Sequence, residues 1–352
     1  MSLIRLPAAQ AAADLSAFNA IIDARSPSEF AEDHLPGAVN WPVLDDEERR
    51  IVGTLYKQVN AFEARKVGAA LVARNIARHI DQWVRPLPRD WKPLVYCWRG
   101  GDRSGTLAWF LERIGFRTHL VDGGYKAFRA VVREDLAQWP ARFDWRVLCG
   151  RTGSGKTRLL QALAAQGAQV LDLEALACHR GSILGDLPGQ PQPSQKGLDS
   201  RIWERLRTID PARPVYVESE SKRIGRLWVP AALIARMREQ GHCIWLNLPD
   251  AQRVQLLLED YAFLRDDPQR LCSLLDGLIE LRGHELVRQW QAAAQAGQIA
   301  EVFADLMRQH YDPGYERSLQ QHFQGLAQAR AIDLPDAGPE AMAAAARTLL
   351  AG

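Results

Sequence analysis

The sequence predicts an α/β protein with two successive parallel-sheet units and a helical C-terminal part. Three observations support this. Short apolar segments alternate with helical ones in the first part of the chain, a second alternation starts at Trp145, and the chain becomes largely helical after Pro249. Alternating strands and helices are typical of parallel sheets covered by helices. A length of 352 residues also suggests two domains.

The first domain is predicted over residues 1–138. Its strands are short apolar runs bounded by turn residues, and its helices show apolar spacing or a Ser-Pro start. The expected strands are Ala20–Ala24, Pro93–Cys97 and Phe116–Val121, with another entered through Leu35–Asn40; helices are expected after Ser26, over Val67–Ile76 and over Gly101–Ile114.

A change of composition at Gln138–Asp144 predicts a linker to a second domain over residues 139–312. Residues 313–352 are predicted to form a helical extension. Gly185–Gly197 is rich in Gly, Pro, Gln and Ser, which predicts a loop. The expected strands are Trp145–Cys149, Gln169–Leu173, Val215–Glu218 and Cys243–Leu248.

Composition and charge exclude several classes of protein. No apolar run approaches the roughly 18 residues of a membrane span, and no signal-peptide pattern is present at the N-terminus, so we expect a cytoplasmic protein. The five cysteines contain no CxxC pair, which leaves neither a zinc site nor a disulfide framework to predict. A net charge of +2 neither predicts nor excludes binding to RNA.

One cysteine stands where a strand is expected to meet a helix. Backbone N–H groups at a helix N-terminus stabilise anions and activate a thiol held there. We therefore predict that Cys97 is catalytic, and that Arg103 adds an oxyanion contact in a loop whose glycines let the backbone curl. The other predicted loop residues are Trp98, Arg99, Gly100, Gly101, Asp102 and Ser104.

The segments around this loop resemble the rhodanese family. The resemblance lies in Asp23–Phe30, His34–Asn40 and Val121–Tyr125 and covers about the first 135 residues. It implies that Cys97 carries sulfur or selenium, while Asp23, Arg25 and His34 are expected to brace the fold.

The spacing from Cys97 to Arg103 is C-x5-R, one residue longer than is usual in single-domain rhodaneses. It resembles the loop of rhodanese-fold phosphatases, which enclose a phosphate. A larger loop suits a donor such as selenophosphate, and it equally allows a phosphatase.

A phosphate-binding loop follows the first strand of the second domain. The pattern G-x-x-x-x-G-K-[ST] lies between a predicted strand and the helical stretch Arg158–Ala165, which is its proper context. Successive N–H groups form an anion nest, the lysine adds a positive charge, and Thr157 is expected to help hold Mg²⁺ if a metal is used. The predicted phosphate-binding residues are Gly150, Arg151, Thr152, Gly153, Ser154, Gly155, Lys156 and Thr157.

Further residues are candidates for a second part of this site. An acidic partner is expected at a strand end, and Glu218, Glu220 and Asp172 all qualify, although Asp172 and Glu174 could instead cap the next helix. Trp203, Trp228 and Trp245 are expected in the core rather than stacked on bases. The remaining candidates are His179, Arg180, Lys222 and Arg223; the first two are expected to form a loop that packs on the phosphate site.

The order of the two motifs resembles the tRNA 2-selenouridine synthase family. The match rests on Cys97–Gly101, Gly150–Thr157, His179–Ser182 and Glu218–Gly225 and spans almost the whole chain. It implies a selenotransferase and geranyltransferase that converts 2-thiouridine at the tRNA wobble position to 2-selenouridine. Its co-substrates would be selenophosphate and geranyl diphosphate, with an S-geranyl intermediate. A selenophosphate-producing enzyme is a further expected partner.

Two other functions remain open from the sequence. A P-loop kinase fused to a sulfurtransferase would hydrolyse nucleotide and need no RNA. A nucleotide-switched binding protein would use the P-loop without catalysis. Which tRNAs bind, which acidic residue supports the phosphate site and what the C-terminal helices do are not predicted by the sequence.

Overall fold

The computed structural model describes residues 3–351 and contains two compact units. The first comprises the chain up to Asp135 together with Ser194–Glu204, and the second comprises Leu136–Pro193 and the chain from Arg205 onward. Ser194–Glu204 thus belongs to the N-terminal unit by its contacts, although it lies between two strands of the second unit. It is part of α9 (Gln195–Arg207), which begins inside the segment predicted as a loop.

The first unit is built on a five-stranded sheet in which every pair is parallel. The predicted strands are confirmed, and the edge strand β1 is an addition that the sequence did not reveal. The strand order is β1 (Ile4–Pro7), β5 (His119–Asp122), β4 (Pro93–Tyr96), β2 (Ala20–Asp23) and β3 (Ala38–Asn40).

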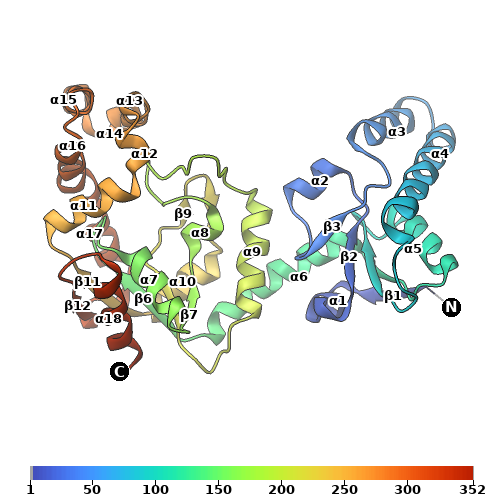
Figure 1. Ribbon diagram of the computed structural model, residues 1–352, viewed down its shortest axis with the longest axis horizontal. Helices are drawn as coiled ribbons and strands as arrows, with labels where there is room; N and C mark the ends of the chain where they lie inside the picture. Colours follow the sequence, from blue (N-terminus) through green and yellow to red (C-terminus); the bar gives the residue numbers. More distant parts are fainter. Residues whose placement is uncertain (1–2, 352) are drawn as a thin grey trace. The chain divides into compact units, whose positions relative to one another are not determined.

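Local signals explain where the helices of this unit begin. A capping box between Ser26 and Glu29, followed by a proline, starts α2 as predicted. A second capping box, between Asp45 and Glu48, starts α3. The α-helices of this unit are α1 (Ala8–Ala13), α2 (Pro27–Glu32), α3 (Asp46–Gln58), α4 (Ala61–His79), α5 (Asp102–Ile114) and α6 (Gly124–Gln138), the last of which leads into the second unit (Figure 1).

The second unit holds another all-parallel five-stranded sheet. Four of its strands were predicted, and the fifth lies in the C-terminal segment that was expected to be helical. The order is β12 (Arg330–Asp333), β11 (His242–Asn247), β6 (Trp145–Cys149), β8 (Val215–Glu218) and β7 (Gln169–Leu171). Between β8 and β11 lies a short antiparallel hairpin of β9 (Arg223–Ile224) and β10 (Leu227–Trp228).

Helices complete this unit, and after β11 they dominate as predicted. They are α7 (Lys156–Ala165), α8 (Leu173–Ala177), α10 (Ala231–Gln240), α11 (Asp250–Asp260), α12 (Ala262–Arg265), α13 (Pro268–Leu275), α14 (Ile279–Arg282), α15 (His284–Gln295), α16 (Ile299–Leu306), α17 (Asp312–His322) and α18 (Pro339–Leu350).

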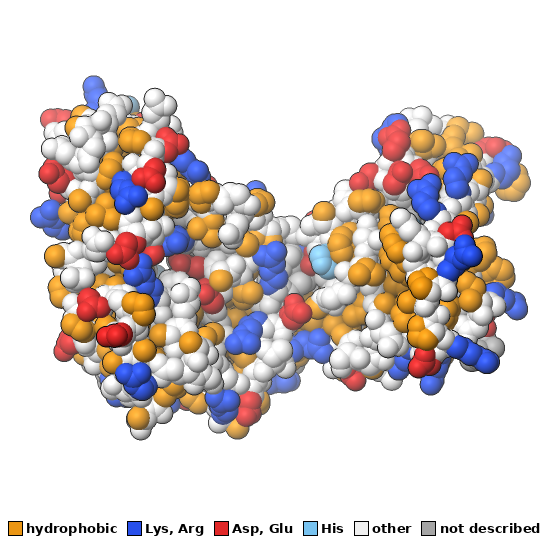
Figure 2. All heavy atoms as spheres, viewed as in Figure 1, with side chains coloured by type: hydrophobic (Ala, Val, Ile, Leu, Met, Phe, Trp, Pro, Cys, Tyr) orange, Lys and Arg blue, Asp and Glu red, His pale blue; other side chains and the backbone are white. Residues whose placement is uncertain are grey.

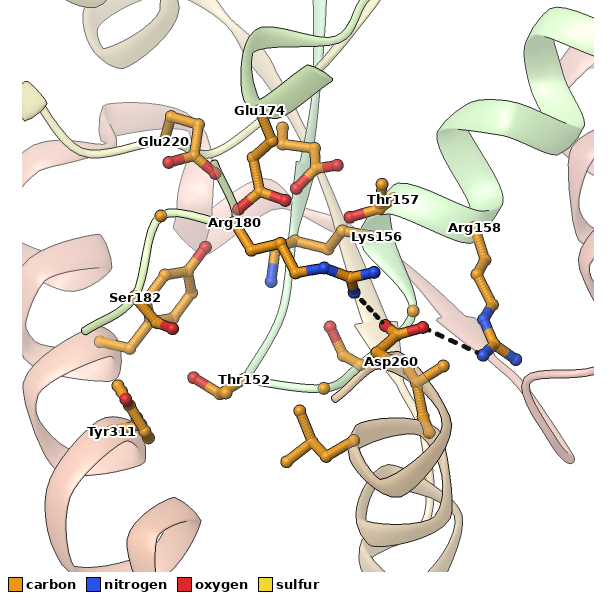
Figure 3. Close-up of a pocket in the computed structure, with 18 of the residues that line it drawn as sticks. Thr152, Lys156, Thr157, Arg158, Glu174, Arg180, Ser182, Glu220, Asp260 and Tyr311 are labelled. Carbon is orange, nitrogen blue, oxygen red and sulfur yellow. Dashed lines mark hydrogen bonds and ion pairs between the residues drawn. The ribbon is translucent and has the colours of Figure 1, made fainter. Parts of the chain in front are cut away.

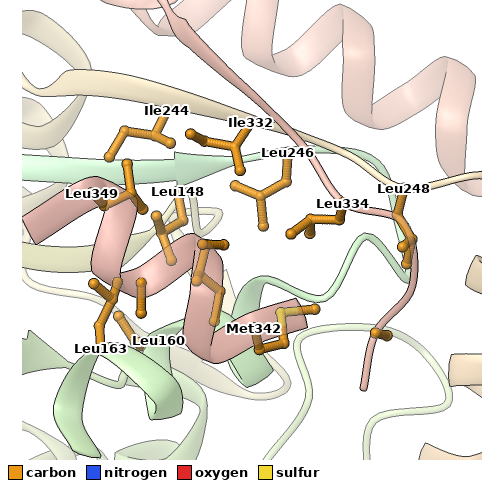
Figure 4. Close-up of a cluster of buried hydrophobic side chains, with 14 of the residues drawn as sticks. Leu148, Leu160, Leu163, Ile244, Leu246, Leu248, Ile332, Leu334, Met342 and Leu349 are labelled. Atoms are coloured by element: carbon orange, nitrogen blue, oxygen red, sulfur yellow. The ribbon is translucent and has the colours of Figure 1, made fainter. Parts of the chain in front are cut away.

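The last helix closes the core over the central strands. Leu148 of β6, Leu246 of β11 and Ile332 of β12 face Met342 and Leu349 of α18, and all are buried (Figure 4). Burying such side chains stabilises a fold by roughly 1.5–3 kcal/mol each. The C-terminal segment is therefore part of the second unit's core rather than an appendage.

Two expectations from composition concern the distribution of surface charge and the presence of membrane-spanning helices. On the face shown in Figure 2, positive and negative side chains are interspersed on both units instead of gathering by sign, in keeping with a net charge of +2. Among residues 3–351, none of the helices combines the length and hydropathy needed to cross a bilayer.

Candidate functional site

The cysteine loop leaves β4 and enters α5, as the sequence predicted. Cys97 is only 3% exposed, and the hydroxyl of Ser104 donates a hydrogen bond to its Sγ at 3.0 Å. Because Ser104 lies in the first turn of α5, this bond fixes the sulfur against the start of the helix. Anions are favoured at that position.

A glycine turn braces the loop from the neighbouring strand. The N–H of Tyr125 donates to the carbonyl of Cys97 at 2.8 Å, and the N–H of Lys126 donates to that of Trp98 at 2.9 Å. Gly100 has φ of +68°, and a Cβ there would lie 2.7 Å from the carbonyl oxygen of Val121. Only glycine fits so close an approach.

The Arg103 guanidinium is paired with a carboxylate, Glu29. Its Nη1 donates to Glu29 Oε2 at 2.7 Å, and Arg49 contacts the same oxygen at 3.1 Å. Although burial of Glu29 works in the opposite direction, these two arginines keep its pKa below the usual value. An anion in the loop would therefore compete with Glu29 for Arg103.

The predicted scaffold residues are confirmed in that role. Asp23 and Arg25 are both fully buried and form a multiple hydrogen-bonded pair, with Arg25 Nε 3.0 Å from each carboxylate oxygen. The Arg25 guanidinium lies 3.9 Å from the ring centroid of Tyr125. Nδ1 of His34 lies 2.9 Å from the carbonyl of Phe30.

The phosphate loop joins β6 to α7 and has the curled backbone that its glycines predict. Gly153 and Gly155 have φ of +72° and +84°. Ser154 is 1% exposed, and its Oγ has no hydrogen-bond partner within residues 3–351. Lys156 Nζ donates to the carbonyls of Gly150 and Arg151 at 3.2 and 3.3 Å. An unpartnered buried hydroxyl and a partly exposed ammonium fit a phosphate ligand.

Carboxylates from two elements converge beside this loop. Oxygens of Glu174, Glu218 and Glu220 lie within 4.8 Å of one another. Glu218 ends β8, which pairs with β6, so parallel register brings it to the edge of the sheet where the phosphate loop begins. Glu174, in α8, was considered only as a helix cap in the sequence and is here a site residue.

Burial and mutual repulsion raise the pKa values of these carboxylates. Burial and then Glu220 raise the pKa of Glu218 to about 8, opposed by Lys156 and Thr157. Burial, followed by the two neighbouring glutamates, also raises the pKa of Glu174 well above its usual value. Oε1 of Glu218 has no hydrogen-bond partner within the described chain. Hard cations prefer such oxygens, so Thr157 and Glu218 with its neighbours fit Mg²⁺.

An ion-pair bridge lies among the residues that line the phosphate cavity (Figure 3). Asp260 of α11 pairs with Arg180 at 3.0 Å and with Arg158 of α7 at 3.2 Å. Arg180 also lies over the ring of Tyr261 at 5.3 Å. The cavity has a volume of about 220 Å³. Arg180 was predicted for this site, whereas Asp260 and Arg158 were not.

Arg253 anchors the phosphate loop from below and was missed. It is 1% exposed and donates to the carbonyl of Thr152 from Nε at 2.9 Å and from Nη2 at 2.7 Å. Its Nη2 also contacts Asp312 at 2.6 Å. Sequence alone gave Arg253 no distinguishing signal, because it lies in an ordinary amphipathic helix.

The sequence Tyr311–Tyr315, which contains a proline and a glycine, predicts a helix stop and a turn, and this prediction is wrong. A π-turn ending at Tyr311 runs directly into α17, which starts at Asp312. Both tyrosines line the phosphate cavity. Lys156 Nζ lies 4.9 Å from the ring centroid of Tyr315, whose hydroxyl is 2.6 Å from Ser219 Oγ.

The remaining predicted residues fall outside the cavity lining. Asp172 caps α8 by accepting the N–H of Ala175 at 2.8 Å, which is the alternative role predicted for it. His179 is 5% exposed and supports its loop, with Nδ1 accepting the N–H of Gly181 at 3.0 Å. Lys222 and Arg223 begin the β9–β10 hairpin and do not line this cavity.

The large tryptophans divide between core and surface. Trp203 is 1% exposed, which confirms its predicted burial. Trp228 is 58% exposed, so its prediction as a core residue is wrong. The reason is the alternation within β10, where Leu227 takes the buried position and Trp228 the outer one. Trp245 is half-buried on β11.

Comparison with known proteins identifies both halves. Residues 7–131 match the model of the rhodanese-like domain, and residues 143–273 match that of the tRNA 2-selenouridine synthase AAA domain. A rhodanese-related protein from Thermoplasma volcanium has a TM-score of 0.25 and 19% identity, covering 36% of this chain and 92% of that one.

Curated relatives match across both units. A tRNA 2-selenouridine synthase of Nitrosomonas europaea is 34% identical over 82% of this chain and 74% of its own length. That of Alcanivorax borkumensis is 34% identical over 85% of this chain and 89% of its own. With a rhodanese-like unit, a phosphate-loop unit and relatives of this extent, the chain belongs to the tRNA 2-selenouridine synthase family.

Proposed function

We propose that this chain modifies tRNA, converting 2-thiouridine at the wobble position to 2-selenouridine. The relatives carry the name of that reaction. We further propose that the conversion proceeds through an S-geranyl intermediate made from geranyl diphosphate, with selenophosphate as the selenium donor.

One observation carries the prenyl part of the proposal: the phosphate cavity continues into an apolar one. The second cavity is walled by Leu184, Phe303 and Leu306. A prenyl diphosphate has a charged end and an apolar chain. The diphosphate would bind at Lys156 and the chain would enter the second cavity. The residues that line both cavities are Thr152, Ser182, Leu257, Tyr261 and Tyr311.

The apolar cavity is small, about 20 Å³. A ten-carbon chain would therefore enter only as side chains at its wall rotate. Tyr311 lies at the junction of the two cavities, and its buried hydroxyl has no hydrogen-bond partner among the described residues. Because Tyr311 lines both cavities, rotation of its ring would widen the passage between them.

The phosphate loop would act on the leaving group. Lys156 and the N–H groups of Gly153–Thr157 would stabilise the departing pyrophosphate while the thiocarbonyl sulfur attacks the prenyl carbon. Mg²⁺, held by Thr157 and Glu218, would neutralise phosphate charge when bound. Alkylation turns the sulfur into a thiol leaving group and makes C2 more electrophilic.

The cysteine loop would supply the second step. Cys97 would orient the selenium of selenophosphate, while Arg103 and the loop N–H groups hold its phosphoryl oxygens; hydrolysis of the Se–P bond would release phosphate and leave selenide as the nucleophile. The Ser104 hydroxyl, already 3.0 Å from Sγ, would keep the chalcogen in place. A selenium nucleophile then displaces the alkyl thiol from C2.

The proposal is tested by nucleoside mass spectrometry. Thiolated tRNA is incubated with the protein and geranyl diphosphate, then with selenophosphate. A geranylated thiouridine followed by selenouridine is expected. The first product without the second would restrict the chain to prenyl transfer, and an unchanged nucleoside with folded, ligand-binding protein would refute both steps.

One observation also favours nucleotide as a ligand. The carboxylates beside Thr157 would suit Mg²⁺ bound to a triphosphate as well as to a diphosphate. A kinase fused to a sulfurtransferase, or a nucleotide switch, would bind ATP or GTP at the loop. RNA-independent hydrolysis of ATP or GTP, with no change in the tRNA, would favour the kinase; nucleotide-dependent binding without turnover would favour the switch.

A further inference from the structure

The β9–β10 hairpin is a small projection fixed firmly to the second unit. Ile224 is fully buried and Leu227 is 3% exposed, so one side of the hairpin is anchored in the core. Gly225, with φ of +55°, forms its turn against Gln192. The N–H of Arg226 donates to Gln192 Oε1 at 2.9 Å. The outer side of the hairpin is thereby held in one orientation.

That outer side presents an aromatic ring beside a guanidinium. Arg223 and Trp228 are directly paired across the two strands, and both are exposed. The Arg223 guanidinium lies 5.9 Å from the centroid of the Trp228 ring. Trp228 is 58% exposed, so the face of its ring is accessible to a flat ligand.

The ring forms one wall of a groove of about 460 Å³. The groove also has Lys222, Arg238 and His322 in its lining, against a single carboxylate, Glu239. The buried Nε of Arg238 has no hydrogen-bond partner within residues 3–351. An aromatic wall with surplus donors and positive charge complements a nucleobase attached to phosphate.

The groove adjoins the phosphate cavity along the chain. Ser221 lines the phosphate cavity and the next residue, Lys222, lines the groove. The carbonyl of Lys222 accepts the N–H of Val229 at 3.0 Å, so the segment after Ser221 is tied directly to the strand that carries Trp228.

We propose that Trp228 and Arg223 form a stacking platform for an unpaired nucleotide next to the modified base of a bound RNA. The inference rests on the proposed function, because it requires an RNA substrate at the adjoining cavity. Trp228 would stack on the base, while Arg223, Lys222 and Arg238 would contact the flanking phosphates. Unpaired bases in a loop can be splayed out in this way, whereas paired bases cannot.

The chain offers a matched control for this tryptophan. Trp109 of α5 is 48% exposed and also has an arginine, Arg113, 5.4 Å from its ring centroid. It lies in the rhodanese-like unit and outside every cavity described above. Both substitutions to alanine thus remove an exposed tryptophan next to an arginine, but only Trp228→Ala does so at the groove.

The test measures binding of the full chain to a synthetic anticodon stem-loop RNA with 2-thiouridine at the wobble position. Trp228→Ala is expected to weaken binding roughly 5- to 150-fold, as loss of one base stack does. Trp228→Phe should recover most of it, and Trp109→Ala should change nothing. Arg223→Gln should lower the slope of log Kd against log salt by about one, whereas Trp228→Ala should leave it unchanged.

The outcomes separate this inference from the proposed function. Modification of tRNA by the unaltered protein, with Trp228→Ala binding within twofold of it, overturns the platform alone. Equal weakening by Trp109→Ala would also overturn it, since the effect would be nonspecific. If the unaltered protein neither binds the stem-loop nor changes the nucleoside, both proposals fall.

Discussion

Glu218 should make the second unit less stable as pH rises. In the unfolded chain a glutamate ionises near pH 4.5, whereas burial and the Glu220 carboxylate raise the pKa of Glu218 in the folded chain to about 8. Between these values the unfolded state loses a proton that the folded state keeps. The contribution to stability is therefore complete below about pH 4.5 and is lost progressively up to about pH 8.

Glu218→Gln removes this titration while keeping the shape of the protonated side chain. One pKa unit corresponds to about 1.4 kcal/mol, so the free energy of unfolding of the variant should exceed that of the unaltered protein by a few kcal/mol at pH 8 and by little at pH 5. The measurement is urea denaturation at several pH values between 5 and 8.5. Glu259→Gln is the control, because that carboxylate is exposed and its pKa is lowered by Gln255 and Arg158.

Two results would refute the reasoning. If the stability curves of Glu218→Gln and the unaltered protein run parallel with pH, Glu218 ionises normally in the fold. If Mg²⁺ stabilises both proteins equally at pH 8, Glu218 does not help to hold the cation. We expect Mg²⁺ to stabilise the unaltered protein more, since it would compensate the buried charge.

Three further predictions follow from buried or reactive groups. Arg253→Met should lower the free energy of unfolding by about 3–5 kcal/mol in denaturant titration, because it leaves Asp312 and the Thr152 carbonyl without their buried partner. The control Arg308→Met removes an exposed ion pair and should cost less than about 0.5 kcal/mol. Lys156→Ala should abolish binding of geranyl diphosphate by calorimetry while circular dichroism shows that the chain remains folded, and unchanged affinity would refute the phosphate assignment. Cys97→Ala should fold normally and still geranylate thiolated tRNA but form no selenouridine by nucleoside mass spectrometry; retained selenation would end its proposed role.

The sheets were predictable because their central strands are continuous apolar runs. Trp145–Cys149 and Val215–Glu218 are buried on both faces, which leaves a clear signal in one sequence. β12 was not predictable in this way. It is an edge strand with one buried residue, Ile332, and its sequence lacks an apolar run.

The candidate site was predictable where a local motif defines it and not where packing does. Lys156 and Cys97 belong to loops whose chemistry is written in consecutive residues. Glu174, Arg253 and Asp260 reach the phosphate loop only because α8 and α11 pack beside it. Their side chains carry no neighbouring pattern, so only the fold brings them together with the loop.

The two loops balance their charge in different ways, and this bears on how each would release a product. In the cysteine loop, the Arg103 charge is already met by ionised Glu29, so an incoming anion replaces one partner by another at little net cost.

In the phosphate cavity, Lys156 faces three glutamates, and burial raises the pKa of each above its usual value. A diphosphate can occupy that cavity without strong repulsion while the acids are protonated. Once the acids ionise, they compete with pyrophosphate for Lys156 and for any bound cation. In the proposed reaction, the same carboxylates would admit an anionic substrate and favour departure of an anionic product, which a permanently cationic pocket would not do.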